Sequence, residues 1–444
     1  MKKTHHIKFV CKLVVAITLM SGFASCSSDD DGSSNKEPAK GDSIRNTAIV
    51  YMAADNNLGD DGFSASDSSE IANGTVYLNA RDQVILYYDN GDDTKIYRFY
   101  KGSTSPQLVR SFNKNMCSSD PMVLKDVLTW IKEKYPSESY GLTCWSHGDG
   151  WIPPHSRNYE QKSMSQRSFG VDCGPGGIPE YNLDHSGFYG AAMDIDSLAW
   201  AIEQSGLHMK YIFFDACLMQ CLESDYELRN VTDYIVASPI SIAAVGTNYT
   251  SLIRAGFFTD NPDDIAKSIY NYMTNLPSYY SAYYDYGVVF STVKTSELDA
   301  LATLTAELLP SSELGGTGSK KEINMNGVQQ YSMYSSSHFY RPEYYDAACT
   351  MRHILSTTDY ERWKAQFDKC VIGKYSTSEF YYDTTTDGQE MFISVDLDNY
   401  GGISMFMPQN RYTYNARRSI YGDLNTAFQK TAWYKAAGWN VTGW

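Results

Sequence analysis

The stretch "YIFFDACLMQ" (residues 211–220) joins a buried-looking strand to a reactive type of side chain. Four apolar or aromatic residues run straight into Asp215, Ala216 and Cys217. A short apolar run of this kind is typical of a strand inside a sheet. A second stretch, "LTCWSHGDGW" (142–151), has the same pattern and passes into His147 and Gly148. The two stretches predict two strands that end on an imidazole and a thiol.

Further apolar runs alternate with helical patterns along the chain. We expect strands at 48–52, 83–89, 94–101, 140–146, 210–215 and 234–239, and helices at 118–136, 193–206 and 218–230. Such alternation favours an α/β fold with a mostly parallel sheet covered by helices on both faces. Sites in these sheets lie at the carboxyl ends of the strands, which is where His147 and Cys217 are placed.

Capping residues, proline and glycine indicate where the expected helices begin and end. Asp120 is an expected N-cap before Pro121, and Asp194 is a second expected N-cap, with Gly206 as the stop of its helix. Cys217 is expected where a strand gives way to a helix, so that the helix dipole lowers the pKa of its thiol.

Composition and charge limit the classes of partner. The chain has 444 residues, 43% of them hydrophobic, and a formal net charge of −15. A surface this acidic disfavours nucleic acid and anionic lipid as partners. Basic peptides would be favoured, through a diffuse field only.

The N-terminus is typical of a targeting segment. Residues 1–25 have a basic start and a short apolar core, and "FASC" places Cys26 where a bacterial lipoprotein signal has its lipidated cysteine. Residues 26–45 are a polar, low-complexity tether whose acidic triplet resembles a surface-export signal of Bacteroidetes lipoproteins. We expect an exported outer-membrane lipoprotein, held at the cell surface by lipid alone. The alternative is a plain secretory peptide.

Nine cysteines lie along the chain, and none forms a C-x-x-C pair. The spacing therefore gives no indication of a zinc site. Without those of the targeting segment and the lipid anchor, an odd number remains, so at least one thiol has no partner within the chain.

A thiol and an imidazole at one sheet edge suit nucleophilic catalysis. The reaction needs a base near Cys217, for which His147 is the candidate, and donors for the developing oxyanion. The backbone N–H groups of Gly148 and Cys217 are the expected donors, because glycine lets the backbone approach a carbonyl closely. Taken alone, the cysteine is more often inert core and the His-Gly pair more often a turn.

The blocks taken together resemble the clostripain family of cysteine peptidases, within the group that includes caspases, legumains and gingipains. "CWSHGDGW" and "FFDACLMQCLE" match its histidine and cysteine blocks. Weaker resemblances are "VYMAADNNL", "RSFGVD", "MDIDSLAWAI", "GISMFMP" and "TAWYKAAGW". The resemblance covers residues 46–444, with a soft subdivision near 255. It implies a caspase-like fold extended by a C-terminal α/β portion.

The resemblance also implies roles for single residues. Cys217 would be the nucleophile and His147 its partner base. Asp215 would lie in the first specificity pocket and bind a substrate Arg or Lys, with Arg favoured for bidentate geometry. The alternative for Asp215 is a cap on the following helix. Asp55 matches another family position, to which we assign no firm role.

Other parts of the chain depart from the family pattern or leave it open. "ASPISIAAVGTNYTSL" (237–252) is apolar where the family often has acids, and this segment should form a wall of the specificity pocket. Some relatives cleave themselves after the histidine block, where Arg157, Lys162 and Arg167 lie. No cofactor is expected. Calcium helps some relatives, yet the acids at 89–93 lack calcium-loop spacing.

Two other functions stay open at this point. An inactive relative would serve as a surface lipoprotein that binds peptide or glycan. A thiol amidohydrolase with non-basic specificity would keep the thiol and imidazole and alter the pocket. The peptidase interpretation, with a protein or peptide as substrate, is favoured because both reactive side chains are present.

Overall fold

The computed structural model describes residues 43–103, 105–152, 169–172, 191–276, 286–316, 318–333, 343–384, 389–416 and 422–444. The expected leader, most of the tether with Cys26, and the three basic residues at 157, 162 and 167 lie outside these ranges. The described residues all fall within one compact unit.

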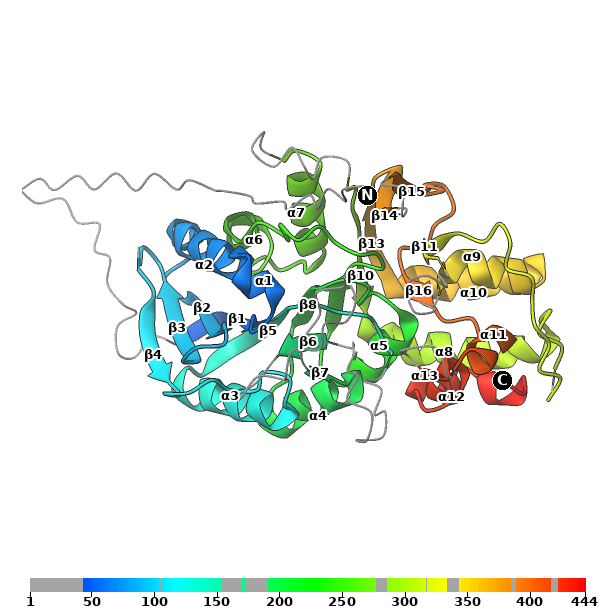
Figure 1. The fold of residues 1–444 in the computed structure, drawn as a ribbon, viewed down its shortest axis with the longest axis horizontal. Helices are drawn as coiled ribbons and strands as arrows, with labels where there is room; N and C mark the ends of the chain where they lie inside the picture. Colours follow the sequence, from blue (N-terminus) through cyan, green and yellow to red (C-terminus); the bar gives the residue numbers. More distant parts are fainter. Residues whose placement is uncertain are drawn as a thin grey trace, which may run out of the picture. The chain divides into compact units, whose positions relative to one another are not determined.

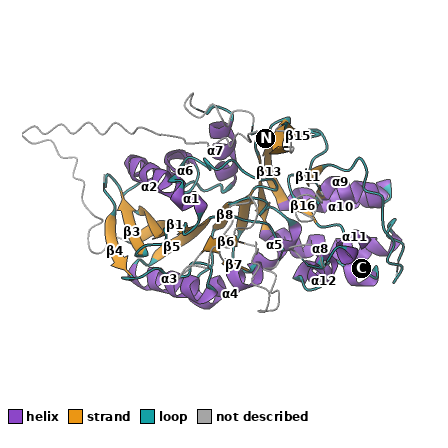
Figure 2. Ribbon diagram, in the orientation of Figure 1, coloured by secondary structure: helices purple, strands orange, loops and turns teal. Residues whose placement is uncertain are grey.

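A nine-stranded sheet forms the centre of this unit (Figures 1 and 2). Its strands, from one edge to the other, are β13 (Val371–Ser376), β10 (Val289–Lys294), β9 (Tyr234–Ala237), β8 (Tyr211–Asp215), β5 (Ser137–Trp145), β1 (Ile44–Ala53), β2 (Asp82–Asp89), β3 (Lys95–Tyr100) and β4 (Gln107–Ser111). Strands β2, β1, β5, β8 and β9 run parallel, while β3, β4, β10 and β13 are antiparallel to their neighbours. The predicted mostly parallel sheet is confirmed.

Alternate residues of the central strands face two separate cores. In β1, Ile49 and Tyr51 belong to one hydrophobic cluster, and Val50 and Met52 belong to the other. This period of two is what a strand buried on both faces requires. Burial on both faces explains why this strand has the near-continuous apolar run "AIVYMAA".

Helices cover both faces of the sheet, as the sequence predicts. One face carries α3 (Pro121–Lys134), α4 (Ile195–Ser205) and α5 (Leu222–Leu228), and the other carries α2 (Phe63–Gly74), α6 (Tyr249–Ala255) and α7 (Asp263–Met273) (Figure 1). The amphipathic pattern of α3 buries Leu124, Val127, Leu128 and Ile131. Asp120 caps this helix by accepting a hydrogen bond from the backbone N–H of Met122.

The C-terminal portion adds helices and small sheets to the same core. Its helices are α8 (Leu298–Leu308), α9 (Ala347–Ile354), α10 (Thr357–Cys370), α11 (Asn410–Tyr414), α12 (Leu424–Phe428) and α13 (Ala432–Ala436). The small sheets pair β11 (Gln330–Ser332), β12 (Tyr344–Asp346) and β16 (Ser404–Met405), and β14 (Glu379–Thr384) with β15 (Glu390–Ser394). A further pair, β6 (Phe169–Asp172) and β7 (Ala191–Met193), lies in the N-terminal half.

One expected helix start is confirmed and another is wrong. Asp194 occupies the N-cap position of α4, as expected, although its side chain makes no capping bond, and burial raises the pKa of its carboxyl to about 7. Helix α5 begins at Leu222, five residues beyond Cys217. Leu218 has a positive φ of 63°, and the backbone N–H groups of Leu218 and Gln220 bond to Ile240 and Ser238 instead of starting a helix.

Candidate active site

The ends of β5 and β8 carry the two reactive side chains to the same edge of the sheet. Trp145 pairs with Asp215 in the parallel register. His147 and Cys217 each follow two residues later, so they leave the sheet at equivalent positions. The backbone N–H of Ser146 lies 3.4 Å from the carbonyl oxygen of Asp215 and keeps the strands together beyond the last pair.

Gly148 packs against the backbone of Cys217. A Cβ atom at Gly148 would lie 2.7 Å from the carbonyl oxygen of Cys217, 2.7 Å from the sulfur of Met219 and 3.0 Å from Cβ of Ala216. Only glycine allows this approach without displacing backbone atoms. The two segments quoted from the sequence are thus in contact, and the backbones proposed to hold the oxyanion lie next to each other.

Cys217 is half-buried beside the segment that follows β9. The backbone N–H of Ile242 lies 3.4 Å from its Sγ, and the carbonyl oxygen of Ile242 lies 3.9 Å away. The expectation that a helix dipole acts on the Cys217 thiol is wrong. Helix α5 starts more than a full turn after Cys217, and the effect of a dipole falls off within the first turn.

His147 is held by a residue that the sequence analysis did not single out. Its Nε2 lies 2.8 Å from Oδ1 of Asn57, the first residue of the short helix α1 (Asn57–Asp60). The signal was present in the sequence. Asn57 belongs to the polar turn that follows the apolar run of β1, and the carboxyl ends of parallel strands share one edge.

Asp215 is a buried carboxylate at the end of β8. Its Oδ2 accepts a hydrogen bond of 3.0 Å from the hydroxyl of Tyr249, and its Oδ1 is buried without a hydrogen-bond partner. Burial raises the pKa of Asp215 to about 7, and the Tyr249 bond opposes that rise. The alternative role as a helix cap is wrong, because Cys221 occupies the N-cap position of α5.

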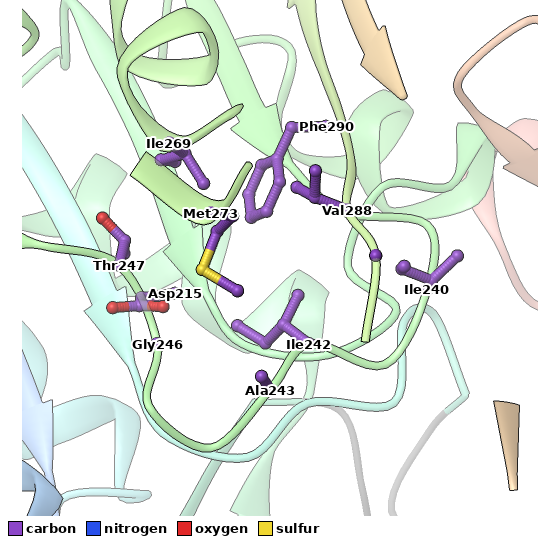
Figure 3. Close-up of a pocket in the computed structure, with 11 residues that line it drawn as sticks. Asp215, Ile240, Ile242, Ala243, Gly246, Thr247, Ile269, Met273, Val288 and Phe290 are labelled. Atoms are coloured by element: carbon purple, nitrogen blue, oxygen red, sulfur yellow. The ribbon is translucent and has the colours of Figure 1, made fainter. Parts of the chain in front are cut away.

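A narrow pocket lies over Asp215 (Figure 3). The expected wall segment supplies part of its lining, with Ile240, Ile242, Ala243, Gly246 and Thr247. The remaining lining is apolar and comes from α7, from β10 and from the two residues before β10, and Figure 3 shows Met273 reaching in between Asp215 and Phe290. The enclosed space is about 10 Å³, roughly what one water molecule needs. A long substrate side chain would require the walls to move.

The described residues contain no group of three or more His, Cys, Asp or Glu side chains arranged to hold a metal. Six cysteines lie in the described ranges, and none of them is joined in a disulfide: Cys117, Cys144, Cys217, Cys221, Cys349 and Cys370. No helix in the part of the chain that the structure describes is both long and apolar enough to cross a membrane.

Comparison with known proteins gives consistent matches. The model of the clostripain family matches residues 50–444. Clostripain of Hathewaya histolytica is 24% identical over 249 residues, which are 49% of this chain and 44% of the relative. The chain thus matches less than half the length of that curated relative.

Solved structures resemble most of the chain. A secreted C11 cysteine protease from Bacteroides thetaiotaomicron, in complex with an irreversible peptide inhibitor, is 25% identical, with a TM-score of 0.71 over 89% of this chain and 99% of that one. An inactive zymogen C11 protease from Parabacteroides distasonis is 23% identical, with a TM-score of 0.68 over the same shares, and shows the fold alone. Because the family model spans nearly all of the described residues, the chain belongs to the clostripain family of cysteine peptidases.

Proposed function

We propose that this protein is an endopeptidase that cleaves peptide bonds through the thiol of Cys217 and the imidazole of His147. The observation that supports this most is the register of β5 and β8, which sets the two residues at equivalent positions of one sheet edge. The close approach of Gly148 to the backbone of Cys217 supports the proposal that the backbone N–H groups of these two residues serve as the oxyanion donors.

The proposed reaction has two halves. The thiol proton passes to His147, and the thiolate attacks the substrate carbonyl. His147 then returns the proton to the nitrogen of the leaving amine as the C–N bond breaks, which leaves a thioester on Cys217. Water attacks the thioester with the same imidazole as base, and the carboxylic acid and the free thiol are released.

We propose Asp215 as the base of the first specificity pocket. A carboxylate at the end of a mostly apolar pocket suits a side chain with an apolar stem and a cationic head. Lysine fits this pocket better than arginine. Tyr249 donates to Oδ2 of Asp215 and the backbone N–H of Thr247 also stabilises this carboxyl, so the side chains of the pocket offer few further acceptors, namely Oδ1 of Asp215 and Oγ1 of Thr247.

The number of donors decides between the two cations. An ammonium carries three donors, whereas a guanidinium carries five in a planar fork. All other side chains that line the pocket are apolar. A guanidinium would leave more donors buried and unpaired, at a cost of about 1–3 kcal/mol each. We therefore expect lysine before the cleaved bond.

Turnover of fluorogenic peptides tests the proposal. Peptides with Lys, Arg or norleucine before the reporter should show hydrolysis by the wild-type chain, with Lys fastest. Cys217→Ala and His147→Ala should abolish it, and Cys117→Ala, which removes another half-buried thiol, should not. EDTA should leave the rate unchanged, since the chemistry needs no cofactor.

Other outcomes would favour the remaining functions. No turnover of any peptide, together with retention of peptide on the folded chain, would support a binding protein. Hydrolysis of norleucine peptides at the expense of Lys and Arg would support a thiol hydrolase without basic preference and remove the role of Asp215.

We also propose that the chain is exported and held at the bacterial surface by a lipid on Cys26. The proposal rests on the leader pattern of residues 1–26 in the sequence. Labelling of growing cells with a clickable fatty acid should mark the wild-type chain and leave Cys26→Ala unmarked. Protease digestion of intact cells should remove the chain if it faces outward.

A further inference from the structure

The hydrogen bond between Asn57 and His147 points to a third member of the reacting group. We propose that Asn57 is a positioning residue that fixes which ring nitrogen of His147 exchanges the proton with Cys217 and the leaving amine. This inference rests on the proposed peptidase function. Asn57 would act through His147 and touch no substrate atom.

The chemistry of the amide assigns the two nitrogens. Oδ1 of Asn57 is an acceptor only, so the ring nitrogen 2.8 Å away, Nε2, must carry a hydrogen. In the neutral ring, the proton-accepting lone pair then lies on Nδ1. The proton of the Cys217 thiol goes to Nδ1, and it leaves Nδ1 for the amine nitrogen when the C–N bond breaks. The hydrogen on Nε2 stays in place throughout and is shared with Asn57.

The neighbouring residue fixes the backbone on which Asn57 stands. The side-chain amide of Asn56 is buried and donates to the carbonyl oxygens of Ala53, at 2.9 Å, and Val171, at 2.7 Å. It also lies 3.3 Å from Oγ of Ser146, the residue before His147. Its Oδ1 accepts from the backbone N–H of Leu58, which starts α1. One side chain thus joins the turn to the end of β1, to β6 and to the strand end that carries His147.

A close backbone approach fixes the other side of the turn. A Cβ at Gly59 would lie 1.9 Å from the carbonyl oxygen of Ala54, so only glycine fits there. The carboxamide of Asn57 is therefore presented from a short segment that is held at both ends. Positioning residues on such rigid supports keep a side chain within the small tolerance that catalysis needs.

The side chain of Asn57 contributes little to the stability of the fold. It is half-buried, and its side chain appears in the described hydrogen bonds only with His147. Its neighbour Asn56 carries the bonds that hold the turn. Removal of the Asn57 carboxamide should therefore disturb the imidazole far more than the fold.

The tautomer of His147 is the first test and needs no substrate. In the full chain with ¹⁵N-labelled histidine, with His147→Gln used to assign the signal, long-range ¹H–¹⁵N spectra above the ring pKa should show the hydrogen on Nε2. In Asn57→Ala the signal should move toward a mixture of both tautomers. A hydrogen on Nδ1 in the wild-type chain would overturn the proposal.

Kinetics give the second test. Asn57→Ala should lower kcat roughly 10- to 100-fold with KM nearly unchanged, because the base is misaligned while the pocket is intact. Asn57→Asp keeps an acceptor and should restore most of kcat. Its carboxylate favours the imidazolium, so the pH profile should shift upward by about one unit. Asp60→Asn, an exposed change in the same helix, should leave kcat and the profile unchanged.

The outcomes separate this inference from the proposed function. Unchanged kcat and pH profile in Asn57→Ala would reject the positioning role, even in an active peptidase. If the wild-type chain cleaves no peptide, the tautomer and the pH dependence of Cys217 alkylation by iodoacetamide still decide it. An Asn57→Ala thiol that alkylates with the wild-type profile would then count against it.

Discussion

In the proposed specificity pocket, the charge of the buried Asp215 carboxyl would decide which substrate side chain is preferred. The groups that face it are Tyr249 of α6 and the backbone N–H of Thr247, which stabilise its charge, and Glu70 of α2, whose negative charge opposes it. The charge of Asp215 in turn raises the pKa of Asp67 of α2. Burial and Glu70 raise the pKa of Asp215 to about 7. Below that pH the carboxyl is neutral and attracts no cation.

This carboxyl predicts a pH-dependent preference for lysine. The ratio of kcat/KM for a Lys peptide to that for a norleucine peptide should rise with pH and level off above about 7. The ratio cancels the titration of His147, which both substrates share. In Asp215→Asn the ratio should be low and flat. In Tyr249→Phe, which removes the stabilising hydrogen bond, the rise should move to higher pH. A flat ratio in the wild-type chain would contradict the prediction.

Glu223 is a second buried carboxyl, and it affects stability instead of specificity. Its Oε1 accepts a hydrogen bond from the backbone N–H of Phe406, and its Oε2 is buried without a partner. Burial raises its pKa from 4.5 to about 7. The folded state thus holds a proton that the unfolded state has lost. The stability from this group is complete below pH 4.5, is lost as the pH rises to about 7, and is constant above.

Glu223→Gln should therefore flatten the pH dependence of unfolding. Between pH 4.5 and 8, the free energy of unfolding should shift in favour of the variant by on the order of 3 kcal/mol. Urea titrations in a Cys217→Ala background, which prevents self-digestion, would measure it. Glu133→Gln, at an exposed position of α3, serves as the control and should follow the wild type.

The turn that follows β5 contains Gly148, and the proposed site depends on its backbone. Gly148→Ala would press a methyl group against the carbonyl oxygen of Cys217 and the sulfur of Met219. We expect kcat/KM to fall at least about 100-fold, because the oxyanion donors would be displaced. The stability should fall by only about 1–3 kcal/mol. Activity assays and thermal melts on the same samples would decide it, and a variant with full activity would remove Gly148 from the site.

The central elements were predictable from sequence, whereas those defined by tertiary contacts were not. The strands β1, β2, β5 and β8 can be recognised in the sequence as apolar runs, because both of their faces are buried. Helix α2 (Phe63–Gly74) was missed, since "FSASDSSEIANG" has only a weak apolar stripe. The late start of α5 depends on bonds from Leu218 and Gln220 to residues after β9, which no local pattern contains.

The same division holds at the site. His147, Gly148, Asp215 and Cys217 stand out because they end strands. Asn57 was not singled out because a polar residue in a turn is ordinary, and its value comes only from the partner that the fold brings to it.

The charge of the whole molecule should affect how it meets its substrates. With a formal net charge of −15, the chain carries a negative field that attracts cationic peptides. For peptides with several lysines, kcat/KM should fall several-fold between low and physiological ionic strength, because salt screens this attraction. A peptide of the same length with zero net charge is the control and should show little change. Equal salt dependence of both would argue against steering.

The pairing of β5 with β8 also bears on whether an incompletely folded copy could cleave proteins inside the producing cell. The imidazole and the thiol stand seventy positions apart along the chain, and only the finished sheet brings them together. Under the proposed mechanism, a newly made or damaged copy with these strands unpaired would have neither a base for the Cys217 thiol nor donors for the oxyanion. Such a copy would not cleave nearby proteins, so peptidase activity would appear only once the sheet is complete.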